Sequence, residues 1–464
     1  MTRIDPESIG RAGDGQEKTL SAVRIAWPAS LEFLVTTLVI FADTLFLARL
    51  GTEVLAGMGL SVTVFRVFYE AFLGIGVAST TVVAQAVGAH NRDLAERGAA
   101  QAISLAILVG IVAGGIGALL ANTAMSLMGQ SGLVQEAGAT YMRINLLASP
   151  FYAVALTGGG VLKGVGDTRT PMFFTLVSSI FKIGLNTVFI YGRWGFPAMG
   201  VAGAALATVI AYGLNMVLII IKLRTGFDGI RIRLRSFSPD RELLKRVVVL
   251  SWPVAVERMV MRIGFVFYVR IISSLGTVAL AANTVAVRLE SIFITVGFGF
   301  TIAATTLVGQ AVGRGDLAGA RDKAYESLRF AFLTMAGLTV ILILLKDLAV
   351  GMFVPEESVR ALAVTCVIIG AFELPALGVL FTFAGASRGA GDTLSPMLVA
   401  AIGTFVFRLP LVYLLGIYFG LGLEGIWYGT LMDWIGRAIL MWLIFRSGRW
   451  EGKAFIEEEE KAED

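Results

Sequence analysis

Long apolar stretches, separated by short polar segments, fill most of this chain. Each stretch reaches about 20 residues or more, the length that an α-helix needs to cross the hydrocarbon core of a bilayer. We expect twelve spans, the second and eighth long enough to tilt or protrude. They lie near residues 23–48, 54–88, 98–124, 137–162, 170–191, 200–223, 247–275, 279–313, 325–346, 358–386, 394–417 and 425–446. The pattern therefore predicts an all-α integral membrane protein.

The two halves of the chain share a repeated sequence pattern, with an offset of 225 residues between matching positions. The string ASTTVVAQAVG at 78–88 returns as AATTLVGQAVG at 303–313, and KGVGDTRTPM at 163–172 returns as RGAGDTLSPM at 388–397. Trp27-Pro28 followed by Glu32 returns as Trp252-Pro253 followed by Glu257. Six spans per copy, an even number, give both copies the same orientation. This pattern is typical of a transporter built from two parallel repeats around a central pathway.

Positive charge gives the expected boundaries and orientation. Lysine and arginine gather in the N-terminal tail, after even-numbered spans, between the halves and in the C-terminal tail. The positive-inside rule then places both termini in the cytoplasm, with the spans in the plasma (inner) membrane. We expect a cytoplasmic tail at 1–22, an N-lobe of helices 1–6 at 23–224, a basic linker at 225–246, a C-lobe of helices 7–12 at 247–446 and an acidic tail at 447–464.

Composition excludes several classes of function. Charged residues make up 16% of the chain and hydrophobic residues 56%, whereas a soluble domain is about a quarter charged. Cys366 and His90 are each the only residue of their type, which excludes an internal disulfide and a cysteine or histidine metal centre. The basic residues lie at helix ends, so we expect no nucleic acid partner. No GxxxxGK[ST] motif supports ATP-driven transport by this chain.

An enzyme is not expected either. GVGDT and GAGDT contain the GxGD pattern of some intramembrane enzymes, but both lie at loop ends and belong to the repeat, so we interpret them as turns.

Ionisable side chains within the spans are the candidate functional residues, because each costs about 2.5–3.5 kcal/mol to insert and therefore faces protein or water. Asp43 stands between apolar residues about two-thirds along the first span. A carboxylate there can hold a sodium ion with neighbouring oxygens or take a proton. Glu32, eleven residues earlier, falls on nearly the same helix face. Lys182 and Asn186 share a face of the fifth span, and Lys182 either serves as counter-ion to these acids or reaches toward an interface.

The second half offers further candidates for coupling or substrate binding. Glu257 is the repeat counterpart of Glu32, and both also suit a structural ion pair with a basic residue. Arg288 and Glu290 lie on the eighth span. Asp433 and Arg437 are four residues apart on the twelfth, a spacing that favours an internal ion pair.

Three strings resemble one family. FADTLFLARLG at 41–51, LNTVFIYGRWGFPAMGVAGAALAT at 185–208 and the GxGDTxxPM turn in both halves are similar to the multidrug and toxin extrusion (MATE) family over about residues 20–450. The resemblance implies V-shaped lobes that export amphipathic compounds through alternating access, driven by sodium or proton entry. Asp43 matches the family's coupling aspartate, and Asn186 and Thr208 match polar residues of the same cavity. Some members carry a second acid at the position of Ile190.

We therefore expect a secondary active exporter of amphipathic, drug-like and often cationic compounds. It needs no cofactor beyond the coupling ion, contacts substrates and membrane lipids, and works as a monomer because one chain holds both lobes. The alternative is a flippase or exporter of lipid-linked or polyisoprenoid-type substrates, which a basic interior with Arg262, Arg288 and Arg408 would favour.

Overall fold

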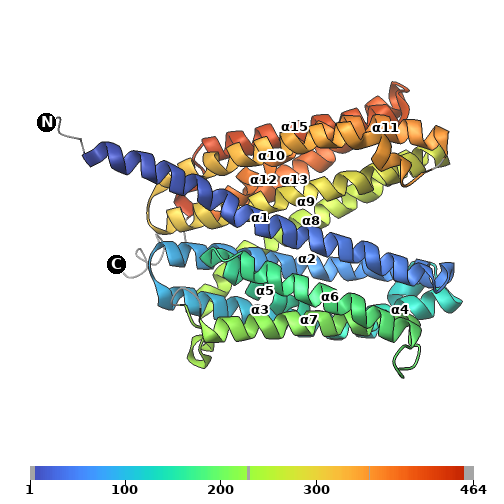
Figure 1. Cartoon of the computed structure of the whole chain (residues 1–464), viewed down its shortest axis with the longest axis horizontal. Coiled ribbons are helices and arrows are strands. Elements are labelled where there is room, and N and C mark those ends of the chain that lie inside the picture. The colour runs from blue at the N-terminus through green and yellow to red at the C-terminus, as the bar shows by residue number, and fades with distance from the viewer. Residues whose placement is uncertain (1–5, 227–229, 355, 454–464) are drawn as a thin grey trace. The chain divides into compact units, whose positions relative to one another are not determined.

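The computed structural model describes residues 6–226, 230–354 and 356–453 (Figure 1). The first five residues of the predicted N-terminal tail, residues 227–229 of the linker and the acidic run at 457–464 lie outside the described residues.

The described chain is built from helices. The main ones are α1 (Pro6–Ala48), α2 (Thr52–Gly88), α3 (Arg92–Leu127), α4 (Gly132–Leu147), α5 (Ser149–Val165), α6 (Arg169–Tyr191), α7 (Gly200–Thr225), α8 (Arg241–Ser273), α9 (Thr277–Gly313), α10 (Leu317–Gly351), α11 (Glu357–Ala371), α12 (Glu373–Gly389), α13 (Leu394–Ile402), α14 (Leu409–Tyr413) and α15 (Gly422–Arg446). Short turns add η1 (Leu234–Phe237), η2 (Gly403–Arg408), η3 (Leu414–Tyr418) and η4 (Glu451–Lys453).

These helices confirm the all-α membrane fold. Eight of them, counting Leu394–Tyr418 as one, are long and apolar enough to cross a membrane, and two bent pairs raise the number to ten. The two remaining predicted spans correspond to α8 and α15, which carry internal charges. The bent pairs are α4 with α5, at 52°, and α11 with α12, at 41°. Each bend comes just before a proline, Pro150 or Pro375, whose nitrogen has no hydrogen to donate to the ordinary helix bond.

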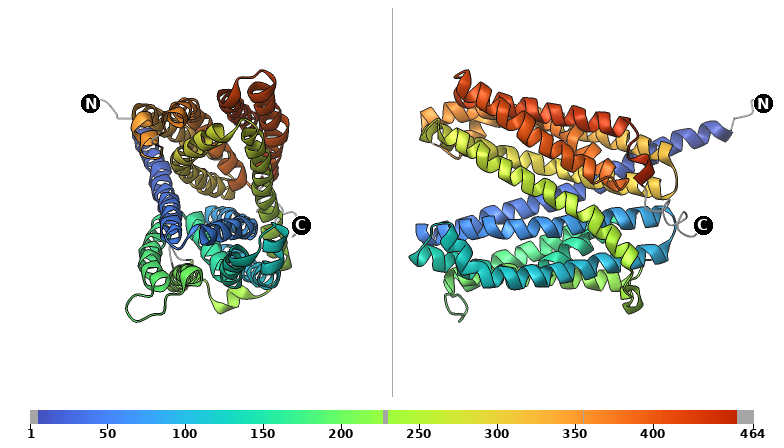
Figure 2. Two further views of the ribbon diagram at one scale, coloured as in Figure 1. Left: turned by 90° about the vertical axis from the view of Figure 1, so that its right-hand side faces the viewer. Right: turned by 180° about the vertical axis from the view of Figure 1, so that it is seen from behind.

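The chain forms two compact units, each described here by itself. One comprises residues 32–255, and the other comprises 1–31 together with 256–464. The chain therefore passes between units inside α1 and inside α8, whereas the predicted lobe boundaries lie in loops. Figure 2 shows the helices of each unit from the end and from behind.

The repeated string at 78–88 and 303–313 packs one long helix on its neighbour within each unit. In the 32–255 unit, α2 lies against α5, and Ser79 and Thr80 donate hydrogen bonds to the carbonyls of Thr157 and Gly160, each at 3.0 Å. In the other unit, α9 lies against α12, and Thr305 donates to the carbonyl of Gly385 at 2.9 Å. The hydroxyls satisfy α-helical carbonyls across the interface, so the string is explained by helix packing.

A second repeated contact holds the first part of α1 in the unit that contains 256–464, and the first part of α8 in the 32–255 unit. Ser30 of α1 donates to the carbonyl of Val296 on α9 at 2.8 Å, and a side chain at Gly299 would meet the Ser30 backbone at 2.8 Å. The counterpart Gly74 of α2 lies so close to α8 that a side chain would meet the Ser251 carbonyl at 2.6 Å. Glycine at these positions allows close helix crossing.

Candidate functional site

The 32–255 unit holds a charged centre around Asp43. Lys182 of α6 donates to Asp43 Oδ2 at 2.5 Å, and Asn186, one turn later, donates to Asp43 Oδ1 at 2.7 Å (side-chain exposures 9% for Lys182 and 15% for Asp43). The i, i+4 spacing of Lys182 and Asn186 allows both side chains to reach one carboxylate. Of the two alternatives for Lys182, the structure therefore has the counter-ion to Asp43.

Tyrosines surround this centre. Tyr141 of α4 lies within hydrogen-bonding reach of Thr208 on α7 and close enough to interact with the charge of Asp43. Tyr152 of α5 donates to Asn145 Oδ1 at 2.5 Å, and its ring packs on Tyr212 with centroids 4.1 Å apart. Thr208 itself donates to the carbonyl of Ala204 at 2.9 Å, so it reaches the centre through Tyr141.

Glu32 and Glu257 occupy matching ion pairs. Lys163 of α5 donates to Glu32 Oε1 at 2.9 Å, and Arg388 of α12 donates to both carboxylate oxygens of Glu257, at 2.7 and 2.6 Å. Lys163 and Arg388 are themselves repeat counterparts, so an equivalent ion pair occurs once in each unit. We call this repeated ion pair the brace. Each glutamate lies within two residues after the point where its helix enters the unit. Glu32 and Asp43, predicted to line one stripe, therefore have separate cationic partners.

The other unit contains a denser charged centre. Arg437 and Arg408 donate to the two oxygens of Asp433, at 2.7 and 2.8 Å, and both guanidinium groups lie over the ring of Trp434. Arg437 also donates to Thr404 at 3.2 Å. Asp433 and Arg437 thus form the predicted ion pair, and Arg408 joins it from η2. η2 is a π-helical segment, an irregularity that is frequent at functional sites.

Two carboxyl groups complete this centre. Glu290 of α9 lies within reach of Glu373, the first residue of α12, and Glu373 is fully buried. Both oxygens of Glu373 and Oε1 of Glu290 have no hydrogen-bond partner within the described part of the chain. Arg408 interacts with both carboxyl groups, but two adjacent buried carboxylates still repel each other, so this pair can share a proton.

Arg288, predicted beside Glu290, is not part of this centre. It is exposed on α9 and forms no ion pair with any residue that the structure describes. Two residues along a helix point in different directions, so only one of the two positions can face the interior.

The repeat places the two centres at related positions with different chemistry. The counterpart of Asp43 is Tyr268, which donates to Asn283 Oδ1 at 3.0 Å, and the counterpart of Thr208 is Asp433. The candidate list omitted Glu373 and the tyrosines 141 and 152. Glu373 could have been found from the sequence, because it is an acid within a predicted span. Tyrosines are too common in an apolar chain to single out as functional residues.

Comparison with known proteins identifies the family. The MatE family model matches residues 28–188 and 253–414, the two repeats. The chain is 30% identical over 443 residues to a probable multidrug resistance protein NorM of Thermotoga maritima, covering 94% of each chain. It is 25% identical over 434 residues to the uncharacterized transporter YisQ of Bacillus subtilis, covering 94% and 95%.

A solved structure shows the same fold. An outward-facing multidrug resistance MATE family transporter of the MOP superfamily superposes with a TM-score of 0.88 at 24% identity, covering 93% of this chain and 95% of its own. Matches to both repeats and over nearly the whole length of these relatives agree with the span count and the duplication. The chain belongs to the MatE family of multidrug efflux transporters: it is a multi-pass membrane transporter and not an enzyme.

Proposed function

We propose that this protein exports amphipathic, drug-like compounds in exchange for protons, with Asp43 as the proton carrier. It acts as a monomer in the inner membrane, with both termini in the cytoplasm. Sodium is the competing coupling ion.

The Asp43–Lys182 contact carries the proposal. An ammonium group already occupies one carboxylate oxygen and the Asn186 amide occupies the other. A sodium ion would have to displace Lys182 from Asp43 and would need several oxygen ligands in its place. A proton needs no such cage: it neutralises Asp43 and releases Lys182.

Asn186 also supports a proton. Its Oδ1 atom is buried with no hydrogen-bond partner among the described residues. If Asp43 is protonated, its carboxyl group becomes a hydrogen-bond donor, and the Asn186 amide can turn its oxygen toward it. The two protonation states therefore favour different arrangements of α1 and α6, which is the requirement for coupling an ion to a conformational change.

The class of substrate rests on the named relatives and on the charge of the interior. Arg408, which would favour a lipid-linked anionic substrate, shares the Asp433 carboxylate with Arg437 and also interacts with the buried Glu373. Arg262 and Arg288 lie exposed on α8 and α9. A lipid-linked substrate therefore stays the alternative, without a structural observation in its favour.

Liposome efflux tests the proposal. Purified protein should export a fluorescent amphipathic cation under a pH gradient alone and not under a sodium gradient alone. Asp43→Asn should abolish this export, whereas Asp347→Asn, which removes an exposed acid at the end of α10, should leave it unchanged. Export under sodium alone would overturn proton coupling. No export under either gradient, from folded protein, would favour the lipid-linked alternative.

A further inference from the structure

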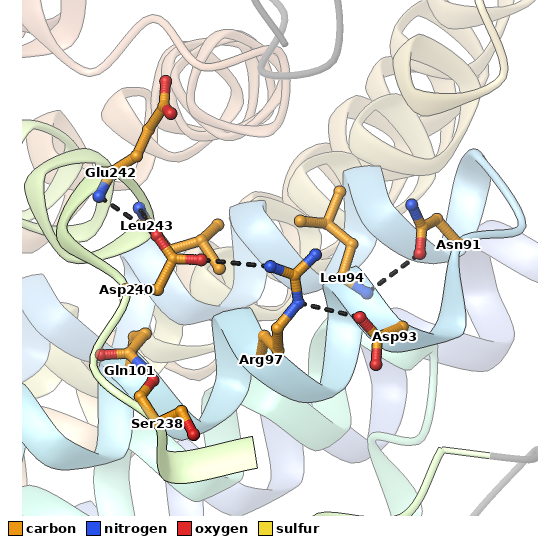
Figure 3. A network of polar contacts seen from close by, with 9 residues as sticks. All are labelled: Asn91, Asp93, Leu94, Arg97, Gln101, Ser238, Asp240, Glu242 and Leu243. Carbon is orange, nitrogen blue, oxygen red and sulfur yellow. Dashed lines mark hydrogen bonds and ion pairs between the residues drawn. The ribbon is translucent and has the colours of Figure 1, made fainter. Parts of the chain in front are cut away.

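The segment between the repeats is held in a defined path on α3. The Arg231 amide donates to the buried carboxylate of Glu96 at 2.8 Å. Gln101 donates to the Ser238 carbonyl at 2.7 Å (Figure 3). Arg97 pairs with Asp240 at 3.2 Å. Asp240 also accepts the amides of Glu242 and Leu243, each at 3.1 Å, and so caps the start of α8. Side chains on this segment therefore point in fixed directions.

Buried side chains lie between exposed basic ones on this segment. Ile230 and Ile232 are each 6% exposed and Ser236 is 4% exposed, whereas Arg231, Arg233 and Arg235 face outward. Arg231 and Arg233 flank the buried Ile232 in a non-helical stretch, and Arg235 lies in the short helix η1, so three exposed arginines fall within five residues. The count of basic residues follows from the positive-inside rule, but this ordered row does not, because a topology signal needs no fixed geometry.

Further exposed cations continue the row. They are Arg224 at the end of α7 and, at the start of α8, Arg241 and Lys245. The nearby acids Glu96 and Asp240 are engaged in the contacts above, and Asp93 pairs with Arg97 at 2.9 Å. Glu242 is exposed on the first turn of α8. We call Arg224, Arg231, Arg233, Arg235, Arg241 and Lys245 the linker cations; their surroundings leave a strong positive excess.

The linker cations follow directly after a candidate membrane span. α7 is a candidate span that ends at Thr225, directly after Arg224. On α8, Val248 and Val249 are 41% and 49% exposed, and Lys245 precedes Val249 by one turn on the same face. Phe237, 36% exposed, adds an apolar side chain among the arginines. Basic side chains next to exposed apolar ones are the arrangement that an anionic lipid surface attracts.

We propose that the linker cations, with Arg231, Arg233 and Arg235 at their centre, form a binding site for the phosphate headgroups of anionic phospholipids. The occupant is a membrane lipid because the row is exposed, positive, next to exposed apolar side chains and located at the end of a span. The inference concerns a lipid site and does not rest on the proposed coupling ion.

Lipid titration of the purified full-length chain tests this site. Native mass spectrometry and thermal unfolding in detergent would compare added phosphatidylglycerol with phosphatidylcholine. Wild type should bind phosphatidylglycerol and unfold at a higher temperature. The variant Arg231→Gln/Arg233→Gln/Arg235→Gln should bind it about 100-fold more weakly, since each basic side chain near an anionic surface contributes about fivefold.

A matched variant removes the same charge elsewhere. Arg49→Gln/Arg193→Gln/Arg270→Gln changes three exposed arginines outside the linker and should bind like wild type. Both variants should unfold at the same temperature as wild type without added lipid. Equal losses in the two variants, or undiminished binding by the linker variant, would overturn the site. Stabilisation by inorganic phosphate alone would show an ion site and would also overturn the lipid assignment.

Discussion

At the scale of single residues, the identity of the neighbour decides what an intramembrane acid can do. Asp43 contacts a lysine and an amide, whereas Glu373 contacts another carboxyl group and no hydrogen-bond donor from the described residues. The first carboxylate is balanced by a cation that can be released. The second accepts no hydrogen bond from its cationic neighbour Arg408, so a shared proton is its readiest balance.

Replacing Lys182 tests the balance at Asp43. In Lys182→Met, Asp43 loses its cation and binds a proton more readily, so we expect the midpoint of the pH dependence of export to move to higher pH. Efflux measured at several pH values, with an equal gradient each time, would show the shift. Lys346→Met, which changes a half-buried lysine paired with its exposed neighbour Asp347, is the control and should keep the wild-type profile. An unchanged profile in Lys182→Met would remove Lys182 from the coupling step.

The sequence predicted part of this centre. Asp43, Lys182 and Asn186 stood out because charged and amide side chains are rare in an apolar span, and the i, i+4 spacing placed two of them on one face. The choice between counter-ion and interface anchor for Lys182 needed the distance between α1 and α6, which no pattern within one helix contains. Tyr141 was missed for the same reason, since only its position next to Thr208 gives it significance.

At the scale of helices, the repeated brace fastens α1 and α8 to their units. Glu257 and Arg388 are 10% and 6% exposed at their side chains, so removing one of them leaves the other as a poorly hydrated charge that has lost its counter-ion.

Removing one partner of the brace should therefore cost more than removing both. We expect Glu257→Met to lower the free energy of unfolding by about 3–5 kcal/mol, and Glu257→Met/Arg388→Met to recover most of it. Thermal unfolding of both variants in detergent measures the difference. The ion pair of Arg321 and Glu451 provides the comparison, because its side chains are 50% and 31% exposed and both its single and double replacements should be mild. A double variant as unstable as the single one would contradict a brace of this kind.

Helix positions were largely predictable, and their junctions were less so. Predicted spans and observed helices agree because apolar runs of this length have few alternatives in lipid. The GxGDT strings are turns as predicted: Asp167 and Asp392 accept the amides of Thr170 and Ser395, at 2.9 and 3.1 Å, at the start of the next helix. The point inside α1 at which the chain changes unit was not predictable, since Leu31 and Glu32 belong to one uninterrupted helix.

At the scale of the whole molecule, neither repeat contains all of the compact unit that it forms. Residues 1–31 belong with 256–464, and the first part of α8 belongs with the N-terminal repeat. Ala22, Ile25 and Ala26 are buried against α9, and Val247 and Leu250 are buried against α2.

Two fragments of nearly equal length test this division. Residues 32–255 contain one complete compact unit, whereas residues 1–226 contain one repeat without its α8 segment. We expect the 32–255 fragment to unfold at a higher temperature and to resist proteolysis longer in detergent, because Gly74 and its neighbours then keep their contact with Ser251. Equal stability of the two fragments would show that the exchanged segments contribute little.

The exchange of first-helix segments has a consequence for how such a chain could arise. Two copies of a single repeat, each lending its first segment to the other, would form a domain-swapped dimer, a low-cost route to association. Joining the copies through one linker makes that exchange intramolecular, so it no longer depends on the concentration of a second chain. Once joined, the copies are free to diverge. The second repeat has a tyrosine, Tyr268, at the position that corresponds to Asp43, and this difference is a result of that divergence.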